Sequence, residues 1–185
     1  MANPEAVVIP GVGNLFVAPV GTGLPVDIDE ALAGAFVNVG FLHEGGATFS
    51  DGKAPGSAIY SWQRRAPVRR TVGNAEPYLE LQLREWDENT FPIAFGGGSV
   101  SATANGHIFV PPTTGETVQR EIVLAMSDGS RLFRLTAGAA EVHTALQLPL
   151  NKMDNAALAV RFEFVTPSDD SAPFDFLTNA AQFGS

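Results

Sequence analysis

Histidine, aspartate and serine positions decide whether this sequence carries a metal or a catalytic site. The chain has three histidines and no cysteine, and His43, His107 and His143 have none of the spacings that bind zinc. Asp27 and Asp29 lack the glycine and the distal glutamate of a calcium loop. A catalytic triad that includes His43 or His143 is still possible, because a triad depends on spatial geometry and not on sequence order. However, the sequence has no Gly-x-Ser-x-Gly motif that would identify a nucleophilic serine. We therefore predict no enzyme activity, no metal and no cofactor.

Two glycine-rich stretches fall short of phosphate-binding signatures. Residues 96–99 (GGGS) are not followed by Lys-Ser or Lys-Thr, and residues 11–13 (GVG) lack the third glycine of a dinucleotide fingerprint. We interpret both stretches as turns that use the freedom of glycine at positive φ.

Arginine clustering is the sharpest electrostatic feature. Four of the 11 basic residues are Arg64, Arg65, Arg69 and Arg70, in a chain of net charge −9. The acidic balance argues against nucleic-acid capture and against a polybasic membrane anchor. A solvated loop and a contact with acidic groups of another subunit remain open for the arginines. We favour the contact because guanidinium groups bind carboxylates well.

Acidic residues gather toward both ends of the chain, since no Lys or Arg precedes Lys53 or follows Arg161. These ends supply candidate partners for the arginines in a neighbouring subunit. The acidic candidates are Asp27, Asp29, Glu30, Asp169, Asp170 and Asp175, and the candidate apolar anchors are Trp62 and Phe176.

The elements that must position these groups are mostly strands. Apolar and polar residues alternate with a period of two, which indicates half-buried strands. The clearest segments are 79–83, 121–126, 141–148 and 158–165, and further candidates are 14–20, 36–43, 58–63, 68–72, 100–104, 107–110 and 131–136. Asn105-Gly106 and Asp128-Gly129 predict hairpin turns, and Gly138 predicts a turn before 141–148.

Helix signals are confined to two short segments. Residues 86–95 have candidate caps in Asp87, Asn89 or Thr90 and end at three glycines, and residues 29–35 are a weaker candidate. The fold class that follows is all-β, a β-sandwich or barrel with one short flanking α-helix. Residues 1–13 and 166–185 form extended N- and C-terminal arms. The second arm is too apolar for a free tail, so we expect it to pack on this subunit or on a neighbour.

Length and composition set further bounds. The 185 residues suit a single domain. No apolar run approaches the roughly 18 residues of a spanning helix, and the first residues lack the features of a signal peptide. Charged residues make up 17%, below the usual value of about 25%. This shortage predicts that other subunits cover part of the surface.

A series of segments resembles the tail tube proteins, or major tail proteins, of actinobacteriophages. The series runs through 13–22 (GNLFVAPVGT), 36–42 (FVNVGFL), 44–48 (EGGAT), 59–63 (IYSWQ), 78–85 (YLELQLRE), Asn89 and 95–98 (FGGG). Each motif is weak alone, but their order over about residues 13–165 is specific.

The resemblance implies a β-sandwich or barrel of the tail-tube type, with 1–185 as one tail tube domain. It also implies hexameric rings that stack into a tube, through which DNA passes from capsid to host without specific binding. Implied partners are a tape measure protein, a tail-tip complex and a tail terminator. The implied location is the virion tail, after assembly in the host cytoplasm.

Three alternatives to a tail tube protein of this kind make different predictions. A tube of a contractile tail or of a type VI-like secretion system differs by its sheath. A carbohydrate-binding β-sandwich on the virion surface requires an exposed aromatic cluster, and we expect neither Trp62 nor Trp86 to lie in one. A small hydrolase requires activity that depends on His43 or His143.

Two structural expectations follow for a tube. The lumen is acidic or neutral, so that phosphates slide without sticking. Candidate lining residues, each on the polar face of an alternating strand, are Glu80, Glu121, Glu141 and Glu163. The segment from about 48 to 71 is a stacking loop that projects from the ring between two strands.

Overall fold

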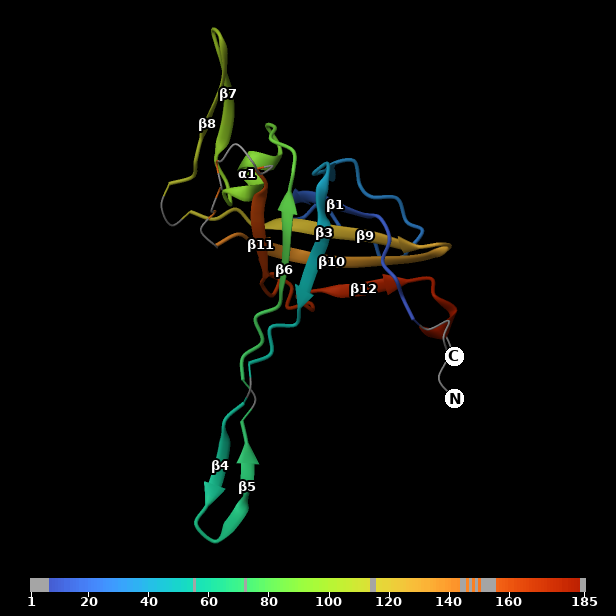
Figure 1. Cartoon of the computed structure of the whole chain (residues 1–185), viewed down its shortest axis with the longest axis vertical. Coiled ribbons are helices and arrows are strands. Elements are labelled where there is room, and N and C mark those ends of the chain that lie inside the picture. The colour runs from blue at the N-terminus through green and yellow to red at the C-terminus, as the bar shows by residue number, and fades with distance from the viewer. Residues whose placement is uncertain are drawn as a thin grey trace.

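A computed structural model describes residues 7–54, 56–71, 73–113, 116–143, 146, 148, 150 and 156–183. These residues form mostly strands with one short helix, which confirms the predicted fold class (Figure 1). Neighbouring strands pair antiparallel in one main sheet that does not close into a barrel. Its order is β2 (Val37–Asn38), β1 (Gly13–Pro19), β9 (Arg120–Asp128), β10 (Arg131–Glu141), β11 (Leu158–Phe164), β6 (Tyr78–Leu83) and β3 (Leu42–Ser50), and β12 (Asp175–Thr178) also pairs with β10.

Strand β10 joins two halves of this sheet. It pairs with β9 and β12 along its first part, and its register breaks between Ala137 and Ala140. Beyond the break it pairs with β11, at Ala140 and Glu141. Figure 1 shows β9, β10 and β12 running across β11, β6 and β3. The two halves therefore face each other like the layers of a sandwich.

The core fills the space between these layers. Leu79, Leu83, Leu158 and Phe162 contribute from one half, and the other half contributes Leu15, Ile122 and Leu135, all fully buried. The residues that alternate with the first group, on β6 and β11, lie on the outer face. The period-two patterns at 79–83 and 158–165 thus predicted both strands and their inward faces.

The predicted turn at Gly138 and the predicted strand over 141–148 are wrong. Gly138 lies inside β10, at the register break. Residue 141 ends β10, residues 142, 143, 146 and 148 are outside any strand, and residues 144, 145 and 147 lie outside the described part of the chain. Val142, Leu146 and Leu148 pack against the core from this irregular segment. Their spacing reflects burial rather than strand structure.

Helix α1 (Thr90–Ala94) is shorter than the predicted 86–95. Asp87 Oδ1 accepts the backbone N–H groups of Asn89 and Thr90 at 2.8 and 2.7 Å, which satisfies donors at the start of the helix. Gly96, Gly97 and Gly98 all have positive φ and end it. The second predicted helix, 29–35, is wrong, because those residues belong to an irregular loop over the sheet.

Two hairpins project from opposite ends of the molecule (Figure 1). One consists of β4 (Ala58–Ser61) and β5 (Arg64–Arg70), the other of β7 (Ser99–Thr103) and β8 (Gly106–Val110). Among the residues described, no helix is long and apolar enough to span a membrane.

The described parts of both terminal segments pack on the chain's own sheet. Gly11 N–H donates to the Ser127 carbonyl at 2.8 Å. At the other end, β12 adds to β10, and a 3₁₀ turn follows at Ala181–Phe183. Phe176, a predicted anchor, lies on β12 and is 55% exposed although its ring contacts Phe49.

Candidate assembly surfaces

The hairpin β4–β5 stands on a hydrogen-bonded stalk. Glu76 N–H donates to the Gly52 carbonyl at 3.2 Å, and Ala54 N–H donates to the Asn74 carbonyl at 3.2 Å. Asp51 and Lys53 form an ion pair at 2.9 Å beside this ladder, and the pair lowers the pKa of Asp51. The predicted stacking loop, about 48–71, begins in the last residues of β3, and Figure 1 shows the β4–β5 hairpin projecting from the main sheet between β3 and β6. That this segment stacks one ring on another stays a prediction. The arginines lie within strand β5 rather than in a loop between strands.

All four arginines of the hairpin are exposed. None of Arg64, Arg65, Arg69 and Arg70 forms an ion pair or a side-chain hydrogen bond with any described residue. Trp62 occupies the two-residue turn between Ser61 and Arg64 and is 100% exposed.

Apolar side chains on the same hairpin are also uncovered. Ile59, Tyr60 and Val68 are each more than half exposed. A two-stranded hairpin alone is marginally stable in water, and a cluster of exposed apolar groups marks an interaction surface. The arginines and apolar groups together make this hairpin the leading candidate for a contact between subunits.

The six acidic candidates at the chain ends are exposed, as a contact with a neighbour requires. They lie on two segments, 20–35 and 166–175. The two segments meet over β10, where an added Cβ at Gly138 would lie 3.1 Å from Pro167 Cγ and 3.7 Å from Leu24 Cδ1.

Glu121 is not a lumen candidate, and that prediction is wrong. Its side chain is buried under the segment 20–35, and its carboxylate accepts the N–H groups of Gly21 and Gly23 at 2.8 and 3.0 Å. Arg134 holds the same segment by donating to the carbonyls of Asp27 and Glu30 at 3.2 and 2.7 Å. Glu121 and Arg134 therefore fix the loop over the outer face of β9 and β10, which is why Glu121, Val123 and Thr136 on that face are buried.

Glu141 also departs from its predicted setting. It ends β10, and its side chain is only 15% exposed. Gln119 Nε2 donates to Glu141 Oε1 at 2.7 Å, and His143 contacts the other oxygen. These two hydrogen bonds, with that from Gln119 the stronger, lower the pKa of Glu141 despite partial burial.

Glu80 and Glu163 remain on the outer face of β6 and β11. Arg161 lies between them, with N–O distances of 3.5 Å to Glu80 and 3.4 Å to Glu163. Its guanidinium carbon lies 3.7 Å from the centre of the Tyr78 ring. Together these two carboxylates and one guanidinium carry one net negative charge.

An aromatic pocket lies where α1 meets the hairpin β7–β8. Trp86 packs edge-on against Phe91 at 5.5 Å between ring centres, and Phe91 packs against Phe109 at the same distance. Trp86 therefore lies in an aromatic cluster, which the sequence did not predict, although Phe91 and Phe109 are only partly exposed. Phe109, which contacts Phe91, comes from a strand 23 residues beyond Trp86 in the chain, and only the fold brings the two elements together. Asp87 and Glu88 lie at the rim of the pocket.

The part of the chain that the structure describes holds no cluster of three or more metal-ligating side chains. Two projecting hairpins, uncovered arginines and an open sheet instead suit a subunit that meets other subunits.

Comparison with known proteins decides the family. A family model described as phage tail tube protein matches residues 1–184. The chain belongs to the phage tail tube protein family. Among curated proteins, it is 28% identical to the major tail protein Gp23 of Mycobacterium phage D29, over 98% of this chain and 95% of the relative. It is 26% identical to the major tail protein Gp23 of Mycobacterium phage L5, over 95% and 92%.

Family membership indicates the general role of the chain. The chain is a structural component of a phage tail, and its β-rich fold agrees with that role. The family assignment confirms the resemblance drawn from the sequence motifs.

Proposed function

We propose that this chain assembles into hexameric rings, and that the rings stack into a tube that conducts DNA from capsid to host. The observation that carries the proposal is the hairpin β4–β5. It projects from the sheet with four arginines that no described residue neutralises and with Trp62 fully exposed. A stable monomer gains nothing from such a hairpin, whereas a stacked assembly uses it to reach the next ring.

Within this proposal, the hairpin contacts acidic groups of a neighbouring subunit, within or between rings. Asp27, Asp29 and Glu30 on one segment, and Asp169, Asp170 and Asp175 on the other, are exposed and available. Exposed ion pairs contribute only about 0–1 kcal/mol each. Charge therefore sets register, and apolar groups such as Trp62 and Phe176 supply most of the affinity.

The lumen is lined, in this proposal, by the polar outer face of β6 and β11. Glu80 and Glu163 lie there, and Arg161 between them leaves an excess of negative charge. Negative charge repels phosphate, so DNA passes without the counterion release that would hold it on a basic wall.

Open sheet edges support ring formation. Among the residues that the structure describes, β3 pairs only with β6 and β12 only with β10, so one side of each strand has no described partner. Pairing between subunits removes such edges, which otherwise promote aggregation. We infer that a tape measure protein, a tail-tip complex and a tail terminator set the length of the tube in the host cytoplasm, and that neither cofactor nor catalysis is involved.

Light scattering and negative-stain electron microscopy of the purified chain over a range of concentrations test the proposal. We expect rings and hollow tubes to form without cofactor. A chain that stays monomeric at high concentration, also after addition of tail-tip complex, would contradict it.

A further inference from the structure

We propose that the tip of hairpin β4–β5 docks into the aromatic pocket between α1 and β7–β8 of a second copy of this chain. The inference rests on the proposed tube and names the contact that stacks one copy on the next.

The pocket is open to solvent, has a volume of about 550 Å³ and is lined by aromatic and acidic side chains. Trp86, Phe91 and Phe109 form the floor of the pocket, and Val100 and His107 line it from the hairpin β7–β8. Aromatic rings accept a further ring in edge-on or offset geometry.

Charged groups at the rim are acidic. Asp87 uses Oδ1 for two backbone N–H groups, while Glu88 makes no hydrogen bond or ion pair with any described residue. Both side chains are exposed and have acceptor oxygens free for a guanidinium.

The tip of hairpin β4–β5 carries an aromatic ring and positive charges, which complement the aromatic and acidic side chains of the pocket. Trp62 is fully exposed, and Arg64 and Arg65 follow it after a single residue, Gln63. An indole that enters the pocket would cover the aromatic floor and place these two arginines at the acidic rim. Arg69 and Arg70, nearer the stalk, remain available for the acidic segments 20–35 and 166–175.

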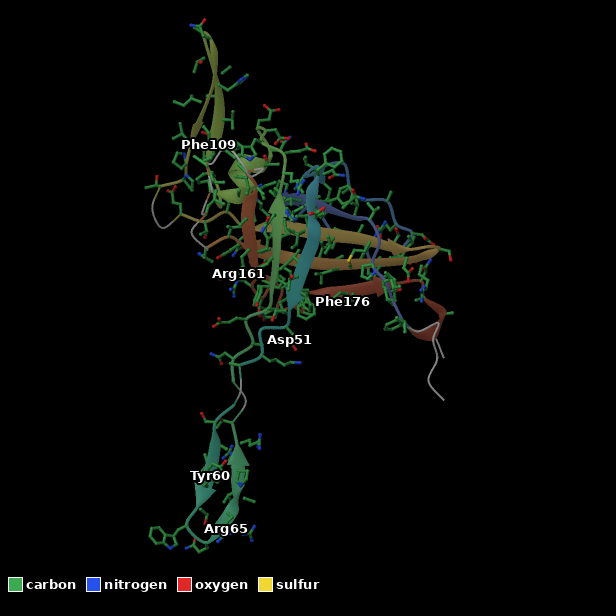
Figure 2. All side chains as sticks on the ribbon, viewed as in Figure 1. Asp51, Tyr60, Arg65, Phe109, Arg161 and Phe176 are labelled. Carbon is green, nitrogen blue, oxygen red and sulfur yellow. The ribbon has the colours of Figure 1, made fainter. Side chains whose placement is uncertain are left out.

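The positions of tip and pocket suit stacking. Figure 2 places Arg65 and Phe109 toward opposite ends of the molecule. The hairpin tip of one copy therefore cannot enter the pocket of that same copy. A contact between unlike surfaces at opposite ends repeats head to tail and builds an open filament. Trp62 lies 11 residues beyond Asp51, which sets an upper limit of about 36 Å on its reach at roughly 3.3 Å per residue. That limit is comparable to the roughly 30 Å diameter of a small domain.

Disulfide trapping tests the contact directly, since the chain has no cysteine of its own. We would combine Arg64→Cys with Glu88→Cys, let the variant assemble, and oxidise it. We expect a ladder of covalent oligomers on a non-reducing gel, because each copy links to two others. The matched control combines Arg64→Cys with Glu80→Cys, on the polar face of β6, and is expected to give no ladder. A third variant, Arg64→Cys with Asp169→Cys, tests the acidic segment as the alternative partner of Arg64.

Assembly measurements provide a second readout. Trp62→Ala should raise the concentration needed for tubes at least tenfold, while Trp62→Phe retains most of the assembly. Glu88→Arg should weaken assembly, and Arg64→Glu with Arg65→Glu in the same chain should restore it. Circular dichroism of each variant should match the parent, since all these side chains are exposed.

The outcomes separate the two proposals. Tubes that form normally with Trp62→Ala, or that give a ladder only with the Asp169→Cys pair, would overturn the docking and leave the tube intact. A chain that never associates head to tail would overturn both.

Discussion

Glu121 is the residue whose role changes most between sequence and structure, and it yields a stability prediction. Its buried carboxylate accepts two backbone N–H groups of the loop that covers β9. Glu121→Ala removes both hydrogen bonds and loosens the loop, so we expect the free energy of unfolding to fall by about 1–3 kcal/mol. Urea denaturation at neutral pH measures the loss.

A matched control for Glu121 lies on the outer face of β6. Glu80 forms an exposed pair with Arg161, so Glu80→Ala should change the free energy of unfolding by no more than about 1 kcal/mol. Equal losses in the two variants would contradict the structural role of Glu121.

Glu141 supplies a pH prediction. Hydrogen bonds from Gln119 and His143 lower its pKa in the folded chain. A lowered pKa adds stability above the unfolded value of about 4.3, and this stability is lost as pH falls through the folded pKa. Glu141→Gln should therefore lower the free energy of unfolding at neutral pH. On acidification, the free energy of unfolding should fall less in this variant than in the parent chain. Urea midpoints at several pH values compare the two chains, and parallel pH curves would refute the assignment.

At the scale of elements, Gly52 controls the stalk of the hairpin β4–β5. It has φ of 63°, and an added Cβ would lie 1.8 Å from the Glu76 carbonyl oxygen. Gly52→Ala should therefore open the stalk without disturbing the core, speed trypsin cleavage at the β5 arginines and weaken assembly.

Gly129 is the matched control for this experiment. Its φ is 62°, but an added Cβ would meet nothing within 4 Å. Gly129→Ala bears only the backbone strain of roughly 1–2 kcal/mol and should leave trypsin cleavage of the hairpin unchanged. Equal cleavage rates in the two variants would show that the stalk does not order the hairpin.

The strands that sequence patterns predicted well have one face in the core and one in solvent. Segment 79–83 is the clearest case, because its leucines all enter the core while its polar residues point outward. The pattern at 121–126 identified a strand but misplaced Glu121, since a loop distant in sequence covers the polar face. A prediction from alternation cannot include that covering loop.

The candidate site was predicted in part. Clustering along the chain was enough to find the arginines, and turn residues were enough to expect a projection. The aromatic pocket was missed because Trp86 and Phe109 come from separate elements. Only packing brings their side chains together.

At the scale of the whole molecule, charge reversal tests the arginine patch. Each Arg→Glu substitution lowers the net charge by two. Converting Arg64, Arg65, Arg69 and Arg70 to Glu therefore lowers the net charge by eight, from −9 to −17. Because the hairpin lies outside the core, we expect a folded monomer that does not form tubes, as sedimentation would measure.

The control for charge reversal converts the same four arginines to Lys. This variant keeps the sign of the charge and should retain part of the assembly, with greater sensitivity to salt because lysine lacks the planar fork. Normal tubes from the Glu variant at low and high salt would make the patch a solvated surface.

Helical reconstruction of the assembled chain by cryo-electron microscopy tests the central claim most directly. We predict hollow tubes of stacked hexameric rings, with the β4–β5 hairpin of each subunit resting on a subunit of the adjacent ring and the face of Glu80 and Glu163 toward the lumen. Tubes in which this hairpin points freely into solvent, or in which arginines dominate the inner wall, would contradict the account.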